Sequence, residues 1–378
     1  MNILFVTSAY PSREKPYYCI YLEQQAKALQ ALGDHVEILL LTRGQEDAHY
    51  SQNGIQIHEM GLGNSRVEKV ITTVKNRRRL EGFSWNRFQA VSIHFGRLAH
   101  MNTIVDICKK QGVATVRHFH GLNVWEEYIP AASPAHRLYE AYLTERKKRL
   151  LRRCDGVVGV SELVCTEVRK KIRKENLYTV YNGVDLERFC PPAEKEPGTL
   201  FRLLCVANLI PLKGQRYLLE AVRSLKERPL KLTLIGEGAD RKMLEDMCEA
   251  LGIKEQVEFL GPKDYDSVAR YMRNSDLFVM PSCYEAFGCV FVEAMSSGLL
   301  TCGCRGTGAE EIITHGVNGL LLEQKDPESI AEAIRFAMDN NDRAVEIAAR
   351  GRERSREFSW ERSGQMLRQV YTHISAGE

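Results

Sequence analysis

The sequence predicts an α/β protein built from two doubly wound, Rossmann-like domains. The chain has 378 residues, enough for about two domains of ordinary size. In both halves, short apolar runs alternate with segments of helical periodicity, which is typical of parallel sheets covered by helices. Between the halves, residues 191–198 (PPAEKEPG) combine three prolines with alternating charges. We therefore expect domains at 1–190 and 191–357, followed by a terminal helix within 358–378.

The first domain opens with a strand, a loop, a helix and a second strand, a unit that favours a parallel sheet. The apolar run NILFVT at 2–7 predicts the first buried strand, and Gly33 ends the helix that follows. The same patterns predict strands at 35–41, 90–95, 113–118 and 156–160, and helices at 20–32, 97–110 and 161–173. Ser161 precedes the last helix and is expected to cap it.

The second domain repeats this order of elements. We expect strands at 201–207, 230–235, 256–260 and 276–280, and helices at 215–227, 240–250 and 266–273. Asp326 and Pro327 are expected to begin a further helix. Residues 235–238 (IGEG) place Gly-x-Gly after a strand, but the third glycine of a dinucleotide fingerprint is missing and position 241 is Arg, so no NAD site is expected.

The two halves differ in charge. Residues 1–190 hold 28 Lys and Arg against 20 Asp and Glu, whereas the rest holds 24 against 29. Basic residues concentrate at 75–79 (KNRRR) and 146–153 (RKKRLLRR), and residues 66–80 have an amphipathic pattern. Two interpretations stay open: solvated faces of ordinary surface helices, or docking on an anionic membrane or an anionic acceptor such as a lipid diphosphate.

Several classes of protein are excluded by composition. The basic runs lack interleaved aromatic residues, so nucleic acid is not an expected partner. No apolar run approaches the ~20 residues of a membrane span, and the N-terminus has no basic region or cleavage site. We therefore expect a cytoplasmic protein, with any membrane contact at the cytoplasmic face. Eleven scattered cysteines without Cys-x-x-Cys pairs or histidine clusters indicate buried thiols, not disulfides or zinc.

The stretch 281–298 (PSCYEAFGCVFVEAMSSG) follows an apolar strand and reads as a loop that enters a helix. The helix N-terminus, near residues 287–289, would offer backbone N–H groups to a phosphate. Glu285 and Glu293 are eight residues apart, about 12 Å at the rise of a helix. This separation exceeds that of a glycosidase pair and suits hydroxyl groups on either side of a diphosphate. The alternative is a solvated helix face. We favour a nucleotide-sugar clamp, with Glu285 on the sugar hydroxyls and Glu293 on the ribose.

Glu285, Phe287-Gly288, Glu293-Ala294-Met295 and the following Gly298 together resemble the signature of family 4 retaining glycosyltransferases. This resemblance implies the GT-B fold, with two Rossmann-like domains facing across a cleft and a terminal helix that crosses back to the first domain. It also implies a metal-independent retaining hexosyltransferase. The donor would be a nucleotide-diphosphate sugar, with a UDP-sugar as first guess. The acceptor would be a glycan or a lipid-linked glycan, as in bacterial cell-surface polysaccharide enzymes of the teichuronic-acid, capsule and exopolysaccharide type.

Family roles fall on particular residues. His120-Gly121, after the strand that ends near His118, is similar to the motif that contacts the donor sugar near the leaving phosphate. Lys213 matches the lysine that binds the pyrophosphate, but Asn208 stands where the family has an arginine. The catalytic set implied is His120, Glu285 and Lys213. The donor-binding set implied is Asn208, Lys213, Leu260, Gly261, Glu285, Ala286, Phe287, Gly288, Cys289, Val290 and Glu293.

Two further positions depart from the family or compete with its motif. Cys19 stands where a glycine is usual in the loop near the acceptor, and His118 points in the same direction as His120 by strand alternation, so we treat it as a decoy. No metal is expected, because no Asp-x-Asp lies in a loop suited to hold a divalent ion. Two other functions stay open: a nucleotide-sugar epimerase on the same fold, and a non-catalytic nucleotide-binding partner subunit.

Overall fold

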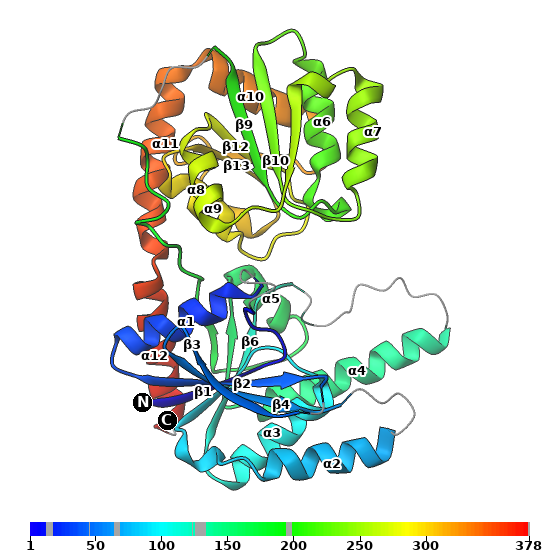
Figure 1. Ribbon diagram of the computed structural model, residues 1–378, viewed down its shortest axis with the longest axis vertical. Helices are drawn as coiled ribbons and strands as arrows, with labels where there is room; N and C mark the ends of the chain where they lie inside the picture. The colour runs from blue at the N-terminus through cyan, green and yellow to red at the C-terminus, as the bar shows by residue number, and fades with distance from the viewer. Residues whose placement is uncertain are drawn as a thin grey trace. The chain divides into compact units, whose positions relative to one another are not determined.

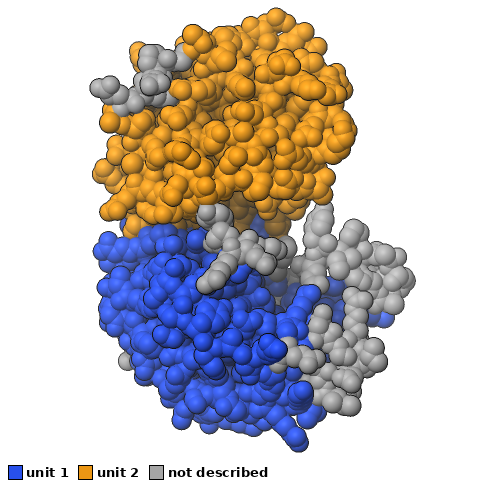
Figure 2. Space-filling view, in the orientation of Figure 1, with its two compact units in different colours: residues 1–182, 360–378 blue, residues 183–359 orange. Residues whose placement is uncertain are grey.

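The computed structural model describes residues 1–12, 18–44, 46–63, 69–122, 124, 134–193 and 199–376. Part of the expected linker (194–198), the start of the amphipathic segment (66–68), and Asn123 and Trp125 of the motif after His120 lie outside the described residues. The chain divides into two compact units, residues 1–182 with 360–378, and residues 183–359 (Figure 2). Our expected boundary lay near 190, whereas the units divide between Asn182 and Gly183.

Within the described residues, unit 1 contains an eight-stranded sheet in the order β3-β4-β2-β1-β5-β6-β7-β8 (Figure 1). Its strands are β1 Asn2–Thr7, β2 His35–Thr42, β3 Ala48–Gln52, β4 Ile55–Gly61, β5 Ala90–Ile93, β6 Ala114–Phe119, β7 Gly156–Gly159 and β8 Leu177–Thr179. Its helices are α1 Ile20–Ala31, α2 Lys69–Glu81, α3 Leu98–Lys110, α4 Pro134–Arg153, α5 Glu162–Arg169 and α12 Trp360–Ser375, with a 3-10 turn η1 at Trp85–Arg87. Every strand pair is parallel except β3 with β4.

Alternation along β1 places core residues on both faces of this sheet. Leu4 and Val6 join the cluster formed with α2, α3 and α4, whereas Ile3 and Phe5 join the cluster formed with α1 and α12. The C-terminal helix α12 therefore belongs to the core of unit 1. It lies so close to α1 that a Cβ added at Gly364 would come within 2.9 Å of Ala28 Cβ.

Unit 2 contains, within the described residues, a six-stranded parallel sheet in the order β11-β10-β9-β12-β13-β14. Its strands are β9 Phe201–Val206, β10 Leu230–Ile235, β11 Val257–Gly261, β12 Leu277–Met280, β13 Leu300–Cys304 and β14 Leu320–Leu322. Its helices are α6 Gln215–Ser224, α7 Arg241–Leu251, α8 Tyr265–Arg273, α9 Cys289–Ser296, α10 Pro327–Asp339 and α11 Asn341–Ser355, with 3-10 turns η2 Pro211–Lys213, η3 Lys254–Gln256, η4 Gly308–Glu311 and η5 Arg356–Phe358. The fold class of two Rossmann-like α/β units is confirmed.

Local capping agrees with the sequence at two predicted sites. The Ser161 side chain accepts a hydrogen bond from Val164 N–H, and the Asp326 side chain accepts from Glu328 N–H at 3.0 Å. The helix after Ser161 ends at Arg169, however, several residues before the predicted end.

All eleven cysteines have free thiols, and most are buried, as predicted. None of the helices among the described residues is long and apolar enough to cross a bilayer.

The predictions missed the β3–β4 hairpin and left α4 unassigned. The hairpin turns at Asn53-Gly54, where both residues have positive φ, 52° and 82°. Asn-Gly is the preferred pair for such a two-residue turn, so the signal was present in the sequence. It was not used because the strand before it, AHYSQ, is largely exposed and lacks an apolar face.

Candidate functional site

Two loops of unit 2 meet at the carboxyl edge of its sheet, because the neighbouring strands β9 and β12 both end there. Cys283 N–H donates a hydrogen bond of 2.9 Å to Leu212 O, and Ser282 Oγ donates to the same carbonyl at 3.3 Å. Gly214 has φ of 71°, and a Cβ there would lie only 2.1 Å from Pro281 O. The backbones can approach this closely only because position 214 has no side chain.

This approach places Lys213 against Glu285. Lys213 Nζ lies 2.7 Å from Glu285 Oε2, and the two side chains are only 18% and 16% exposed. Glu285 Oε1 also accepts a hydrogen bond of 3.1 Å from Ala286 N–H. The sequence predicted both residues as ligands of the donor but not that they bind one another. Asn208, on the same loop as Lys213, is exposed, and its carbonyl accepts from Gln215 Nε2 at 2.9 Å.

The helix α9 begins where the sequence places it, directly after Gly288. Gly288 has φ of 86°, and a Cβ there would meet the Phe291 ring at 2.6 Å. The loop before it is fixed from behind, since Gly308 N–H donates to Glu285 O at 2.9 Å. Ala286 and Phe287 are buried, whereas Cys289 and Val290, in the first turn of α9, are partly exposed. The result is a fixed loop that leads from Glu285 into a helix N-terminus.

Glu293 lies on α9 and is 6% exposed. Burial raises the pKa of this carboxyl to about 7, although the hydroxyl of Tyr265 and the nearby charge of Arg188 act in the opposite direction. Tyr265 Oη donates a hydrogen bond of 2.8 Å to Glu293 Oε1, and the Arg188 guanidinium lies 5.5 Å from the centre of the Tyr265 ring. Neither partner was predicted, because no local pattern distinguishes them from surface residues.

Tyr265 lies inside an Asp-x-Asp sequence that has structural partners. The Asp264 side chain caps α8 by accepting from Ser267 N–H at 2.6 Å. Asp266 lies 3.1 Å from Arg188 Nε. The two carboxylates therefore fix the start of α8 and the position of the arginine above Tyr265.

The end of β11 supplies Leu260 and Gly261. Gly261 has φ of 69°, and its carbonyl accepts from Gly236 N–H at 3.0 Å. Gly236 and Gly238 are the glycines of the Gly-x-Gly sequence after β10. A Cβ on either would lie about 2 Å from a backbone oxygen of residues 207–209, at 2.0 Å and 2.1 Å respectively. Close packing of two loops accounts for these glycines.

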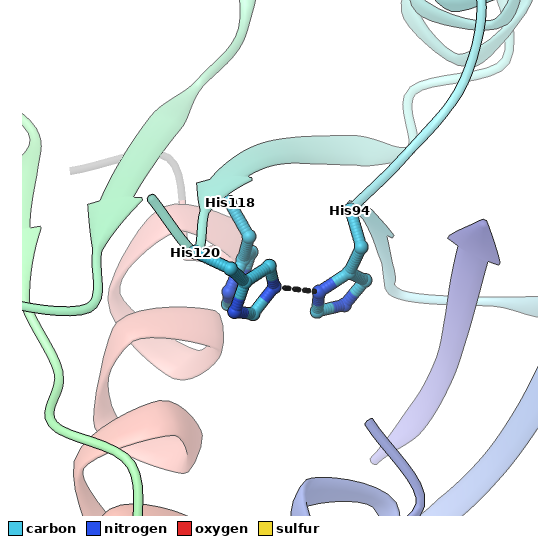
Figure 3. Close-up of side chains that lie close together, drawn as sticks. All are labelled: His94, His118 and His120. Atoms are coloured by element: carbon cyan, nitrogen blue, oxygen red, sulfur yellow. Dashed lines mark hydrogen bonds between the residues drawn. The ribbon is translucent and has the colours of Figure 1, made fainter. Parts of the chain in front are cut away.

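In unit 1, His120 follows β6 and lies beside two other histidines, His94 and His118 (Figure 3). His94 Nδ1 lies 2.9 Å from His120 Nε2, and one ring nitrogen of each of the three residues lies within 4.8 Å of the others. The sequence offered His118 as a decoy and missed His94, and the expectation of no histidine cluster was wrong. His94 directly follows β5, the neighbour of β6, so the sheet order brings the three together.

The surroundings of these three histidines favour the neutral form of each imidazole. Burial and, to a smaller extent, the charge of nearby Arg117 lower the pKa of His120 to about 3. Burial, neighbouring histidines and Arg117 lower the pKa values of His94 and His118 well below the ordinary range. Arg117 is partly buried, and its Nη1 donates to Ile93 O at 2.8 Å and to His118 O at 2.6 Å. The cluster therefore consists of neutral rings beside a fixed positive charge.

A cavity of about 1190 Å³ opens in unit 1 at the carboxyl ends of β1, β2, β5 and β6. Its described lining combines apolar side chains with four cationic ones and contains neither Asp nor Glu; the cationic residues are Arg43, Arg97, Arg117 and Lys147. Cys19 also lines it and has φ of 55°, in the left-handed region that favours glycine.

Two family profiles match adjoining parts of the chain. The profile described as Glycosyltransferase Family 4 matches residues 20–188, and that described as Glycosyl transferases group 1 matches residues 189–354.

Curated relatives are similar over part or all of the chain. An uncharacterized glycosyltransferase of Methanocaldococcus jannaschii, MJ1178, is 30% identical over 221 residues, 58% of this chain and 60% of that protein. D-inositol 3-phosphate glycosyltransferase of Corynebacterium urealyticum is 30% identical over 220 residues, 53% of this chain and 52% of that protein. The match thus spans less than two thirds of the length of either relative. A second M. jannaschii protein, MJ1607, is 25% identical over 98% of both chains.

Solved structures share the whole architecture. Sucrose-phosphate synthase from Thermosynechococcus elongatus superimposes with a TM-score of 0.81 at 20% identity, covering 100% of both chains. Anabaena HepE, in complex with UDP, gives a TM-score of 0.75 at 20% identity, covering 99% of this chain and 100% of HepE. Adjoining parts of the chain thus match two glycosyltransferase families, residues 20–188 that of family 4 and residues 189–354 that of group 1, and the fold is the GT-B fold.

Proposed function

We propose that this glycosyltransferase moves a sugar from a nucleotide-diphosphate donor, with a UDP-sugar first, to a glycan or lipid-linked acceptor, with retention of anomeric configuration. The pathway we propose is the synthesis of a cell-surface polysaccharide. The observation on which this rests is the 2.7 Å pair of Lys213 and Glu285 beside the start of α9. It combines a cation for phosphates with a carboxylate for sugar hydroxyls. The UDP found in HepE supports the choice of nucleotide.

The donor would exchange partners with the Lys213–Glu285 pair. The Lys213 ammonium turns to the diphosphate, and the freed Glu285 carboxylate accepts hydrogen bonds from the sugar. Cleavage of the anomeric bond places negative charge on the leaving diphosphate, which Lys213 and the N-terminus of α9 then stabilise. Glu293 accepts from the ribose hydroxyls, and Leu260 and Gly261 border the base. Asn208 donates a hydrogen bond where the family has a charge.

We further propose that catalysis needs no divalent cation, since Lys213 and the α9 terminus supply the positive potential. Turnover is expected to persist after exhaustive treatment with EDTA. A strict requirement for added Mg²⁺ or Mn²⁺ would contradict this mechanism.

The acceptor, in this proposal, occupies the cavity of unit 1. Its lining is apolar and cationic, which suits an acceptor that carries a phosphate next to an apolar or sugar portion. Names of relatives support an anionic acceptor: D-inositol 3-phosphate glycosyltransferase, and a phosphatidylinositol monomannoside mannosyltransferase of Mycobacterium tuberculosis that is 30% identical over 45% of this chain. His120, in the same unit, contacts the transferred sugar.

We place the protein in the cytoplasm, with peripheral contact to anionic membrane through unit 1. Exposed cations on α2 and α4 support this placement; they are Lys75, Arg78, Arg149 and Arg152. The helices α2 and α4 both pack against α3, so these cations belong to one side of the sheet.

The test begins with donor selection. UDP, GDP, ADP and their sugars are each added to the purified protein, and the shift of the melting temperature is measured. Binding of one nucleotide class, abolished by Lys213→Met, supports the donor site. The selected donor is then incubated with and without candidate acceptors, and the anomeric configuration of the product is read by NMR. Inversion would contradict retention, and conversion of the donor alone to an epimer would favour an epimerase.

A further inference from the structure

A continuous chain of polar contacts crosses the interior of unit 1 and ends at His120. Tyr371 Oη, from α12, lies 3.0 Å from Ser92 Oγ, which lies 3.0 Å from His94 Nε2. His94 Nδ1 then lies 2.9 Å from His120 Nε2. At its other end, Tyr371 Oη lies 3.2 Å from His118 Nε2. Ser92, His94 and Tyr371 are 0% exposed, so no bulk water competes for these bonds.

Because each contact holds one proton, the proton positions along the chain depend on one another. Tyr371 donates across its shorter contact, to Ser92, so the Ser92 hydroxyl proton is free to be donated to His94 Nε2. His94 is neutral and must then carry its proton on Nδ1, where it donates to His120 Nε2. His120 in turn must carry its proton on Nδ1. At the far end, His118 Nε2–H donates to the Tyr371 oxygen.

The remaining polar atom of His120 is the end of this chain. His120 Nδ1 is buried and has no hydrogen-bond partner among the described residues. A buried N–H without a partner costs roughly 1–3 kcal/mol. Such an atom, next to two residues that line the unit 1 cavity, Arg117 and Phe119, indicates a group that an oxygen of a ligand satisfies.

A metal site is the competing interpretation of the three histidines. Zinc requires imidazole nitrogens ~2.0–2.1 Å from the ion, but Nδ1 and Nε2 of His94 both lie in hydrogen bonds, as does Nε2 of His118. Arg117 also places a positive charge beside the rings. Both observations oppose a divalent cation and favour a neutral hydrogen-bonded chain.

We propose that Tyr371, Ser92 and His94 are positioning residues that hold His120 as a neutral Nδ1–H tautomer, so that Nδ1 donates a hydrogen bond to an oxygen of the bound substrate. The identity of that substrate rests on the proposed function. The tautomer does not, and it is tested without any ligand.

The first experiment reads the tautomers directly. The full-length protein is labelled with ¹⁵N-histidine, and long-range ¹H–¹⁵N spectra are recorded between pH 6 and 8, with signals assigned by single His→Gln variants. The proposal expects His94 and His120 both as Nδ1–H and His118 as Nε2–H, unchanged by pH. An Nε2–H signal from His94 or His120, or a mixture of tautomers, would overturn it.

The second experiment breaks the chain at its far end. Tyr371→Phe removes the hydroxyl between Ser92 and His118, so His94 and His120 should show a second set of signals from the Nε2–H tautomer. The matched control is Tyr178→Phe, because the Tyr178 hydroxyl is also buried in unit 1 but lies outside the chain. The control should leave the spectrum of the cluster unchanged. An unchanged spectrum in Tyr371→Phe would refute the coupling, whatever its effect on stability.

The third experiment links the tautomer to turnover. We expect Tyr371→Phe to lower kcat about 3- to 10-fold, the range of one hydrogen bond, and to change KM for the donor less. His94→Asn retains an N–H near the Nδ1 position and should preserve more activity than His94→Leu. Correct tautomers with equal kcat in all variants would refute the role in positioning. A fixed tautomer without transferase activity would instead refute the proposed function alone.

A zinc titration of the same labelled sample tests the competing interpretation. Addition of one equivalent of Zn²⁺ is expected to leave the signals of the three histidines in place. Stoichiometric loss of the Nδ1–H and Nε2–H protons would establish a metal site and overturn the proposal.

Discussion

The two sheets of this protein present their polar groups in opposite electrostatic states. At the carboxyl edge of the unit 2 sheet, Lys213 and Glu285 form a charged pair, and buried Glu293 has a pKa of about 7. At the corresponding edge of unit 1, His94 and His120 are neutral and hydrogen-bonded, because burial lowers their pKa values. In our proposals, the first arrangement supplies charge to a substrate, whereas the second supplies one oriented hydrogen bond.

This difference predicts which substitutions and pH changes should affect each unit. Charge in unit 2 can be removed by substitution and modulated by pH, because Glu293 exchanges a proton near neutrality. The hydrogen-bonded side chains in unit 1, Tyr371, Ser92, His94 and His120, should not titrate between pH 5 and 8. Their response should come from the loss of single hydroxyl or imidazole groups. The predictions below test this contrast in order of expected size.

The largest effect is expected at Lys213. Lys213→Met removes the cation that faces the developing charge on the diphosphate, so kcat should fall by ~10²- to 10³-fold, about 2.7–4 kcal/mol. Lys242→Met is the control, because Lys242 is paired with Asp246 on the exposed surface of the same unit. Steady-state kinetics with the selected donor measure both. Equal rates for the two variants would show that the diphosphate is stabilised by other groups.

Glu293 should make stability depend on pH. Its pKa is about 7 in the folded chain against 4.5 for the ordinary group, so the unfolded chain loses the proton first as the pH rises. The stabilising contribution is complete below about pH 4.5 and declines until about pH 7, by about 3 kcal/mol in total. When the pH is raised from 4 to 8, the free energy of unfolding of Glu293→Gln should therefore increase by about this amount relative to that of the wild type.

Urea unfolding at the two pH values measures the Glu293 difference. Glu332→Gln, on an exposed position of α10, is the matched control, with the same chemical change outside the interior. If both variants follow the wild type in parallel, the carboxyl of Glu293 does not titrate in this range.

A smaller difference between variant and control is expected where the two site loops touch. Gly214→Ala forces a Cβ to within 2.1 Å of Pro281 O, whereas Gly252→Ala has a similar positive φ, 65°, but meets nothing within 4 Å. Both should incur about 1 kcal/mol for the left-handed backbone. Gly214→Ala should lose a further ~1–3 kcal/mol of stability to the clash and should also weaken nucleotide binding. Thermal unfolding of both variants, with and without nucleotide, measures these losses. Equal losses of stability would indicate that the two loops can move apart without a cost in free energy.

The smallest effect is expected at the basic surface of unit 1. Arg149 is exposed on α4, and a cation near an anionic membrane contributes about 1 kcal/mol. Arg149→Gln should therefore weaken binding to phosphatidylglycerol-containing vesicles about fivefold. The effect of the substitution should be smaller at high salt. Arg352→Gln is the control, because Arg352 is an exposed residue on α11 of unit 2. Sedimentation with vesicles decides, and no difference between the variants would favour a simple solvated face.

Most of the fold followed from periodicity, and so did part of the site. Apolar runs placed most of the strands because parallel strands are buried on both faces, but β3, β4, β8 and β14 were not predicted. Glu285, Gly288 and Glu293 lie where their local sequence placed them around α9. The β3–β4 hairpin escaped because β3 is exposed and lacks an apolar face. Exposed strands have little hydrophobic signal, so their turn residues must be read instead.

What the sequence could not supply were contacts between distant elements. His94 and His118 are brought together by strand order, and Tyr371 reaches His118 from a helix 253 residues away. Tyr265 and Glu293 meet in the same way, across 28 residues. Such pairs leave no trace in periodicity, because each residue alone resembles an ordinary member of its helix or strand.

The place of α12 in unit 1 bears on how the chain matures. Unit 2 is inserted between Asn182 and Trp360, so the last helix must be synthesised before the face of α1 can be covered. Residues 183–359 can complete their own interior earlier, although they are translated after most of unit 1. A released chain that ends at residue 359 should therefore hold a complete unit 2 and an incomplete unit 1, whose uncovered α1 face attracts chaperones.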